Sequence, residues 1–271
     1  MSQTETMAQK GKCMNNDIII LTSTALGVGA ATVIGAIFGF CFKNISHKFS
    51  DIVLAFAAGI MLAAAVLGLI VPSVEYGVEM VGNYAILITV AGIFLGAIVI
   101  SLLDRLVPHL HKPDGGDIEE HHGNDRVDKV LLFVLAIAIH NLPEGIAAGV
   151  GFGTGNNAEA FMIALGIALQ NIPEGMVIIA PMLSAGVTPK KTFLYAALTG
   201  LVEVVGTFIG YFAVSIASAV LPFALAFAGG TMLYVISDEM IPETHEHGYQ
   251  QAATYALLIG FSVMLVMDFL L

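Results

Sequence analysis

Two consecutive apolar stretches decide the fold of this chain: residues 129–152, KVLLFVLAIAIHNLPEGIAAGVGF, and residues 158–183, AEAFMIALGIALQNIPEGMVIIAPML. Each stretch is long enough to cross a hydrocarbon core about 30 Å thick as a helix that rises about 1.5 Å per residue. In lipid, only helices and closed barrels satisfy their backbone polar groups, and these runs are continuous rather than alternating, which favours helices. The sequence therefore predicts an all-α polytopic membrane protein.

The composition of the whole chain agrees with this class. Of its 271 residues, 57% are hydrophobic and only 11% are charged, and the mean hydropathy is +0.88; a soluble domain carries about 25% charged residues. These values exclude a disordered chain, a disulfide scaffold and a secreted enzyme, and Cys13 and Cys41 form no metal-binding pair. The net charge of −11 disfavours nucleic acid as a partner. It suits a protein that handles cations, although solvated acidic loops would give the same balance.

Similar apolar runs recur along the chain, and we expect a single transmembrane domain over residues 1–271 that crosses the lipid bilayer eight times. Residues 1–16 form a polar N-terminal tail, and the run after them is too long for a signal-peptide core, so we expect a retained first helix. The boundary between the sixth and seventh spans is weak and falls near Ser218 and Pro222. The predicted spans are 17–42, 51–72, 83–103, 129–152, 158–183, 191–217, 219–237 and 250–271.

The positive residues predict which side of the membrane each loop faces. All Lys and Arg residues of the loops fall in the first, third and fifth loops, and the second, fourth and sixth loops hold none. By the positive-inside rule the odd-numbered loops are cytoplasmic and both termini are extracytoplasmic, although Lys10 and Lys12 on the tail oppose this. The positive loop residues are Lys43, Lys48, Arg105, Lys112, Arg126, Lys129, Lys190 and Lys191.

Two of the odd-numbered loops carry histidine and acidic residues. The third, 104–128, is predicted to be a flexible cytoplasmic loop, which either binds metal through its histidines or is a solvated linker. The seventh, 238–249, has no Lys or Arg, so it either attracts cations or is a polar turn. The residues are His109, His111, Asp114, Asp117, Glu119, Glu120, His121 and His122 in the third loop and Asp238, Glu239, Glu243, His245, Glu246 and His247 in the seventh.

The centre of each quoted stretch has the pattern Asn-x-Pro-Glu-Gly, at residues 141–145 and again at 171–175. Glu144, Glu174 and a third acid in the sixth span, Glu203, lie well inside apolar runs. A carboxylate at this depth costs about 2.5 kcal/mol or more unless it is paired, neutralised or bound to a cation. Because no Lys or Arg lies at comparable depth in any span, protons or metal ions are the remaining partners.

The spacing within each copy places nitrogen and oxygen donors on one helix face. His140 lies four residues before Glu144, Gln170 lies four residues before Glu174, and each Asn lies three residues before its Glu. Imidazole with carboxylate suits zinc, iron, manganese, cobalt or cadmium better than magnesium or calcium. The prolines of both copies free the carbonyl four residues earlier, next to the expected ligands, and such irregular backbone is tolerated where it lines a cavity.

The remaining polar side chains leave alternatives open. Asn141, Gln170 and Asn171 either bind the ion directly or form hydrogen bonds to its ligands. Glu203 is either a ligand or a protonated structural acid. The joint occurrence of two motif copies and a third buried acid favours ion binding by the group as a whole.

With these motifs the chain resembles the ZIP (Zrt/Irt-like) family of metal transporters, and in particular its GufA-like branch. The likeness covers essentially the whole chain: eight helices, a long loop after the third helix, and the paired motifs in the fourth and fifth. The resemblance implies a 3+2+3 helix arrangement with an inverted repeat around the metal-bearing pair, and a homodimer.

The resemblance also implies a binuclear metal site midway through the membrane. One position would use His140, Glu144, Gln170 and Glu174, and the other Asn141, Glu144, Asn171, Glu174 and Glu203. The implied pathway residues are Met61, which otherwise faces the core or the lipid, and Asp268 toward the outside, with Asp238, Glu239, His245 and His247 toward the inside. Some members carry Asp at position 171 and others His at position 170, so Asn and Gln there should weaken the second position and broaden selectivity. The His-Glu-x-Pro-His-Glu signature of the LIV-1 branch is missing.

From these features we expect a transporter, not an enzyme, that moves a divalent transition metal toward the cytoplasm. Zinc is the first candidate substrate, followed by cadmium, iron, manganese and cobalt, and no prosthetic group is expected. A membrane metallohydrolase is disfavoured because the chain has no His-Glu-x-x-His motif. A metal-binding membrane sensor and a proton-coupled carrier of another cation remain as alternatives. The compact loops favour a bacterial plasma (inner) membrane over an organelle membrane.

Overall fold

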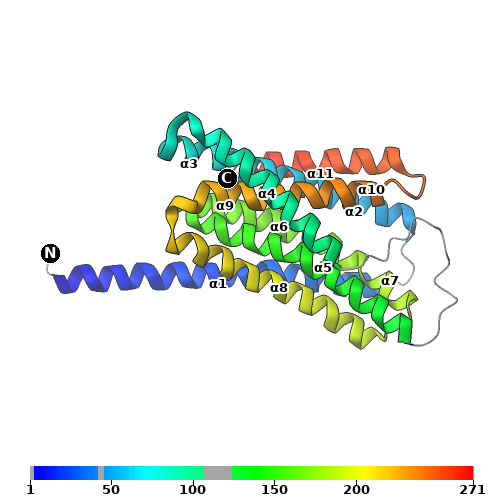
Figure 1. Cartoon of the computed structure of the whole chain (residues 1–271). Helices are drawn as coiled ribbons and strands as arrows, with labels where there is room; N and C mark the ends of the chain where they lie inside the picture. The colour runs from blue at the N-terminus through cyan, green and yellow to red at the C-terminus, as the bar shows by residue number, and fades with distance from the viewer. Residues whose placement is uncertain (1–2, 42–45, 107–123, 271) are drawn as a thin grey trace.

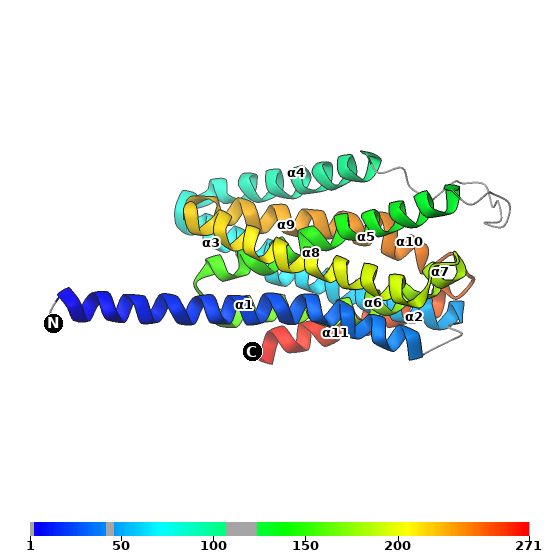
Figure 2. The same cartoon turned by 90° about the horizontal axis from the view of Figure 1, so that it is seen from below.

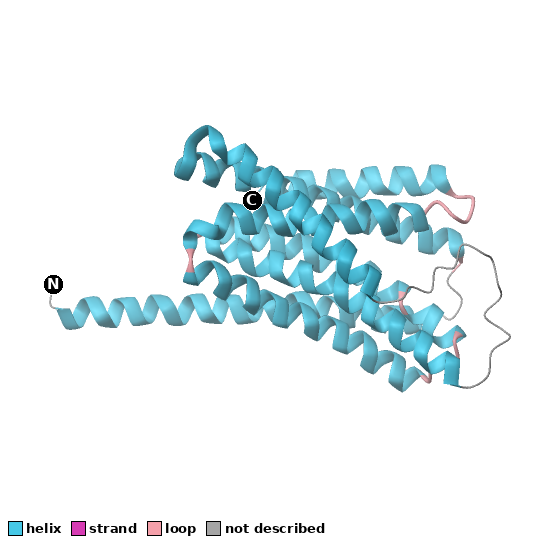
Figure 3. Ribbon diagram, viewed as in Figure 1, coloured by secondary structure: helices cyan, strands magenta, loops and turns pink. Residues whose placement is uncertain are grey.

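The computed structural model describes residues 3–41, 46–106 and 124–270. Within these ranges every regular element is helical and no strand occurs, and the long helices run side by side as one bundle (Figures 1 and 2). The loops that the structure describes are short and gather at the two ends of the bundle (Figure 3). The predicted all-α class is therefore confirmed for the described residues.

Successive long helical segments alternate in direction along the bundle (Figures 1 and 2). In chain order they are α1 Gln3–Cys41, α2 His47–Ala63, η1 Ala64–Ile70, α3 Val71–Val81, η2 Gly82–Tyr84, α4 Ala85–Leu106, α5 Asn124–Gly151, η3 Phe152–Thr154, α6 Asn157–Val177, α7 Ile179–Ser184, α8 Pro189–Ile216, η4 Ser218–Val220, α9 Leu221–Val235, η5 Ile236–Met240, α10 Ile241–Glu243 and α11 Gln250–Leu270. Helix α1 extends beyond the other helices at its N-terminal end, and α11 ends toward that same end (Figures 1 and 2).

Six helical segments of the described residues are long and apolar enough to cross a membrane, and α5 is not among them. One segment, His47–Leu103, has 57 residues, far more than the roughly 20 that one crossing needs. It reverses at Gly82, whose φ of 59° is readily adopted by glycine. Large apolar side chains on the outside of α4 and α11 are exposed, as lipid contact requires; they include Leu87, Phe94, Leu258, Ile259 and Phe269.

Several helices extend beyond the predicted spans, because the sequence pattern marks the apolar part of a helix and not its ends; the apolar segment of the first helix begins at Ile18, next to the predicted start at 17. Helix α1 begins at Gln3, before the predicted start at 17, and α5 begins at Asn124, before 129. Residues 73–81 and 238–243, predicted as loops, continue the helical segments of the second and seventh spans. Residues with good helix propensity prolong a helix into water in this way. The weak boundary near residues 218–222 is confirmed, since α8 ends at Ile216 and α9 begins at Leu221.

The irregular turns do not lie where the motif prolines predicted them. Pro143 and Pro173 sit inside α5 and α6, which continue through both residues. The irregular turns are the π-helical segments η1 and η5, each of which ends one residue before an X-Pro step at Pro72 or Pro242. At these turns the N–H of residue 71 reaches the carbonyl of residue 66, and that of 241 reaches 236. The wider turn keeps the carbonyl four residues before each proline away from its ring.

Four helix pairs form the most extensive contacts of the bundle: α5 with α8, α4 with α9, α1 with α6, and α2 with α11. The metal-bearing helices predicted from the sequence, α5 and α6, also pack against each other and occupy the interior. Helix α1 packs against α6, and α8 packs against α5. These contacts bring residues of α1 and α8 next to the motif copies.

Candidate metal site

The last residue of each motif copy sets the distance between helices at the site. A Cβ atom on Gly145 of α5 would lie 2.8 Å from the Cα of Glu203 on α8. A Cβ atom on Gly175 of α6 would lie 3.0 Å from the carbonyl carbon of Thr32 on α1. Real Cβ contacts are not this short, so both positions require glycine. The glycines therefore let α8 and α1 bring Glu203 and Thr32 directly beside the two motif copies.

The Glu203 carboxylate is the centre of a buried hydrogen-bond network. Its Oε1 accepts hydrogen bonds from Thr32 Oγ1, at 2.8 Å, and from Asn141 Nδ2. Its Oε2 accepts one from Asn171 Nδ2 at 2.6 Å, and the same amide also points at the carbonyl of Val28 at 3.3 Å. All four polar side chains of the network are at most 2% exposed. Because the amide nitrogens are used on Glu203, the amide oxygens of both asparagines face away from it.

Several polar atoms in the same place are buried without a hydrogen-bond partner of good geometry. They are Oε2 of Glu144, Oδ1 of Asn171 and both polar atoms of Gln170, and these residues are at most 1% exposed. Burial of such groups without a partner costs about 1–3 kcal/mol each, and such groups mark a place where an ion or a water molecule can bind. No Lys or Arg forms an ion pair with Glu144, Glu174 or Glu203 in the part of the chain that the structure describes. The donors left over are oxygen-rich and suit a cation.

His140 points to the other side of the cluster. Its Nε2 lies 2.9 Å from Oε1 of Glu239, which is on the π-helical turn η5. Across the described ranges, no three His, Cys, Asp or Glu side chains stand in a geometry that holds a metal. In the central cluster, His140 is engaged by Glu239, and Glu203 is engaged by its three donors. Metal binding through Nε2 of His140 requires this nitrogen to leave Glu239.

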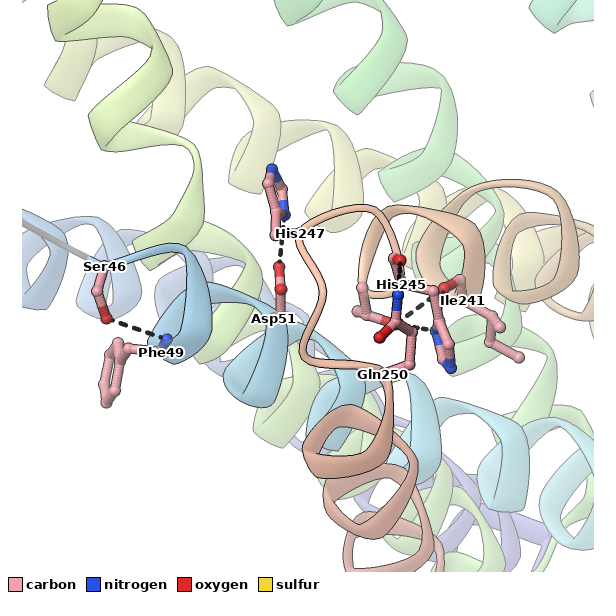
Figure 4. A network of polar contacts seen from close by, with 8 residues as sticks. Ser46, Phe49, Asp51, Ile241, His245, His247 and Gln250 are labelled. Atoms are coloured by element: carbon pink, nitrogen blue, oxygen red, sulfur yellow. Dashed lines mark hydrogen bonds and ion pairs between the residues drawn. The ribbon is translucent and has the colours of Figure 1, made fainter.

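The remaining predicted residues are spread over the bundle. Met61 is 1% exposed in the main hydrophobic cluster, and Asp268 is exposed near the end of α11. Asp238 is exposed beside Glu239. His245 Nδ1 lies 2.8 Å from the carbonyl oxygen of Ile241, within its own turn (Figure 4).

His247 binds elsewhere: its Nδ1 lies 3.0 Å from Oδ1 of Asp51 on α2. Of the six predicted pathway residues, the structure therefore joins only Glu239 to the central cluster by a polar contact. The histidines and most acids predicted for the third loop lie in 107–123, outside the described residues.

Thr32 is a site residue that the motif search missed. The signal is present, because residues 29–40, GAATVIGAIFGF, and 200–211, GLVEVVGTFIGY, share their spaced glycines. The offset is 171 residues, which pairs Thr32 with Glu203. The first glycines of the two segments, Gly29 and Gly200, also touch each other's backbone, one helical turn before the Thr32–Glu203 hydrogen bond.

Comparison with known proteins identifies the family. The profile of the ZIP zinc transporter family matches residues 122–268, which contain both motif copies, Glu203 and Glu239. The chain belongs to the ZIP family. It is similar to the zinc transporter GufA of Myxococcus xanthus, with 39% identity over 92% of this chain and 95% of that protein.

Two further relatives extend the likeness across the bacterial ZIP proteins. The zinc transporter ZIPB of Bordetella bronchiseptica is 37% identical over 88% of this chain and 77% of its own length. The zinc transporter ZupT of Chlorobaculum parvum is 36% identical over 93% and 98%. The resemblance to the GufA-like branch is confirmed, and the chain is an integral membrane protein of a family of metal transporters.

Replacing Thr32 by valine is expected to weaken zinc binding about tenfold. The change keeps the shape but removes one of three donors to Glu203, and a hydrogen bond to a charged group contributes about 1.5–3 kcal/mol. Zinc titration of the purified protein by calorimetry measures the effect. Thr199→Val is the matched control, because Thr199 is equally buried on α8 and bonds only within its own helix, to the carbonyl of Ala196. Equal affinities for the two variants would contradict a role for Thr32 at the site.

Proposed function

We propose that this ZIP protein takes up divalent transition metals, zinc first, into the cytoplasm through the buried cluster on α5, α6 and α8. The observation that carries the proposal is the set of unpartnered oxygens of Glu144, Gln170 and Asn171 in a region without a buried Lys or Arg. A dehydrated divalent cation satisfies such oxygens and balances the carboxylates, which a packed apolar core cannot do. Cadmium, iron, manganese and cobalt fit the same donors.

The cluster offers donors for two ion positions. One comprises His140, Glu144, Gln170 and Glu174, and binding there exchanges the Glu239 contact of His140 for the metal. The other uses the two motif glutamates with the amide oxygens of Asn141 and Asn171, while Glu203 either joins them as a ligand or holds the amides in place from behind. Glu239 then receives the ion as His140 releases it, and Asp238 lies next along the exit.

The arrangement of the bundle supports the finer topology expected for the family. Eight spans in a 3+2+3 order with an inverted repeat agree with the 171-residue offset of the matching glycine segments and with the pairing of α1 with α6 and α5 with α8. Extracytoplasmic termini agree with the common direction of the α1 start and the α11 end (Figure 1). We place the protein in a bacterial plasma membrane, as a homodimer, with Asp268 at the outer mouth and Met61 beside the approach.

Zinc flux into proteoliposomes tests the function directly. Wild-type protein is expected to give zinc-dependent signal from an entrapped fluorescent chelator, and competition by the other metals then ranks them. Glu174→Ala is expected to remove the flux, since it deletes an oxygen donor from both positions. Metal binding without any flux under an imposed zinc gradient would support a sensor instead. Flux of protons without metal would support the proton-coupled carrier.

Replacing Asn171 by aspartate is expected to make stability depend more strongly on zinc. The change removes the amide donor to Glu203, now 2.6 Å away, and sets two carboxylates against each other. Without metal the repulsion lowers Tm, and zinc removes it, so the zinc-induced rise in Tm exceeds that of the wild type. Thermal unfolding in detergent, with chelator and with zinc, measures both values. Asn156→Asp, at the exposed cap of α6, is the control. A zinc shift no larger than wild type would refute the second position.

A further inference from the structure

We propose a second transition-metal site at the end of the bundle where α2 begins, formed by His47, Asp51 and His247. It lies apart from the central cluster and shares no residue with it. His47 and Asp51 are one helical turn apart on α2, so their side chains share a face. His247 comes from the turn between α10 and α11 and closes over that face.

Two contacts link the three side chains, which do not stand in metal-binding geometry until the imidazole rings turn. His247 Nδ1 lies 3.0 Å from Oδ1 of Asp51, and Figure 4 shows the two residues pointing toward each other across the gap between α2 and the turn. The imidazole rings of His47 and His247 stack with centroids 4.3 Å apart and planes 25° from parallel. Two histidines and one carboxylate thus meet, although His247 lies nearly 200 residues after His47 and Asp51 in the sequence.

Asp51 is the observation that points to a ligand. Its residue surface is only 2% exposed, and Oδ2 is buried without any hydrogen-bond partner, while Oδ1 is used by His247. A carboxylate oxygen left unpartnered in this way is costly. The nearby cation of Lys48 lies 5.9 Å above the ring of Tyr249. A metal ion bound to Asp51 would satisfy the free oxygen.

The donor set defines the class of ion. Two imidazoles and one carboxylate with an open fourth position suit zinc or cobalt in tetrahedral geometry. The ion displaces the proton that joins His247 to Asp51, and the stacked rings turn about their side-chain torsions so that one nitrogen of each faces Asp51. Both histidines are exposed enough for this rotation, since the His247 side chain is 36% exposed and His47 lies on the surface.

Cobalt(II) binding to the full-length protein in detergent tests the site without measuring transport. The parent protein carries Glu144→Ala and Glu174→Ala, which disable the central cluster, and glutamine at His109, His111, His121 and His122, which removes the histidines of the third loop. We expect the parent to bind one cobalt ion per chain with the visible absorption of a four-coordinate site. Asp51→Asn, which keeps the shape of the side chain, and His247→Gln should each weaken binding at least tenfold.

Two further variants separate loss of a metal ligand from damage to the fold. His47→Gln changes a surface side chain at the start of α2, so it should weaken binding without disturbing the fold. His245→Gln is the matched control, because His245 lies in the same turn as His247 but bonds to the Ile241 carbonyl, and its affinity should equal the parent's. A parent that binds no cobalt, or Asp51→Asn with unchanged affinity, would overturn the proposal. Neither result would bear on zinc flux through the central cluster.

Discussion

Replacing Glu144 by glutamine is expected to reduce zinc flux into proteoliposomes by roughly 100-fold or more. Glu144 is 1% exposed on α5, and its Oε2 is among the buried oxygens that have no hydrogen-bond partner of good geometry. It belongs to both proposed ion positions, so the substitution removes a charged ligand from each. Loss of residues that merely support metal ligands already costs about 10- to 100-fold, and loss of a shared ligand should cost more. The rate of zinc entry at fixed protein density measures the effect.

The same chemical change elsewhere provides the control. Glu159 on α6 accepts hydrogen bonds from Tyr76 and Asn156 away from the cluster, and Glu159→Gln should retain most of the flux. Size-exclusion profiles of both variants show whether the proteins remain folded. If Glu144→Gln transports zinc at the wild-type rate with normal folding, the ion does not pass through the motif cluster, and the proposed site is wrong.

Replacing Gly145 by alanine is expected to destabilise the protein and abolish transport together. The added Cβ would lie 2.8 Å from the Cα of Glu203 and closer still to its carbonyl oxygen. Backbone atoms cannot rotate away as a side chain can, so α8 must shift and carry Glu203 out of the network. Overpacking of this kind costs about 1–3 kcal/mol or more. That exceeds the 0.5–1 kcal/mol that alanine gains over glycine inside a helix.

Thermal unfolding in detergent and zinc flux measure the two consequences. Gly27→Ala is the control, because Gly27 is also helical, on α1, and a Cβ there would meet nothing within 4 Å. That variant should be as stable as the wild type or slightly more stable, with full flux. A Gly145→Ala protein with unchanged Tm would mean that the helices separate easily at this point and that close packing of α5 on α8 does not fix the site.

The sequence was sufficient to predict the class of the protein, and it singled out the two helices of the proposed site. A chain with such long apolar runs and so few charges cannot cover its surface as a soluble fold, and the two Asn-x-Pro-Glu-Gly copies mark the segments that form α5 and α6. The family comparison confirmed the resemblance that these residues carry. Helix ends were predicted less well: residues 238–243 continue the helical segment that contains Glu239. Local hydropathy indicates which part of a helix lies in lipid, whereas helix propensity influences where the helix ends.

Contacts between distant residues were decided only by the tertiary structure. Nothing in the local pattern at residue 32 distinguishes a threonine that donates to Glu203 from one that faces lipid; the approach of Gly175 to α1 and of Gly29 to Gly200 decides it. The same holds for His140, which the spacing assigned to a metal and which contacts Glu239, and for His247, which contacts Asp51. Periodicity fixes the face of one helix on which a side chain lies. Which side chain it meets depends on how closely two backbones approach, and in this bundle glycines far apart in the chain set that distance.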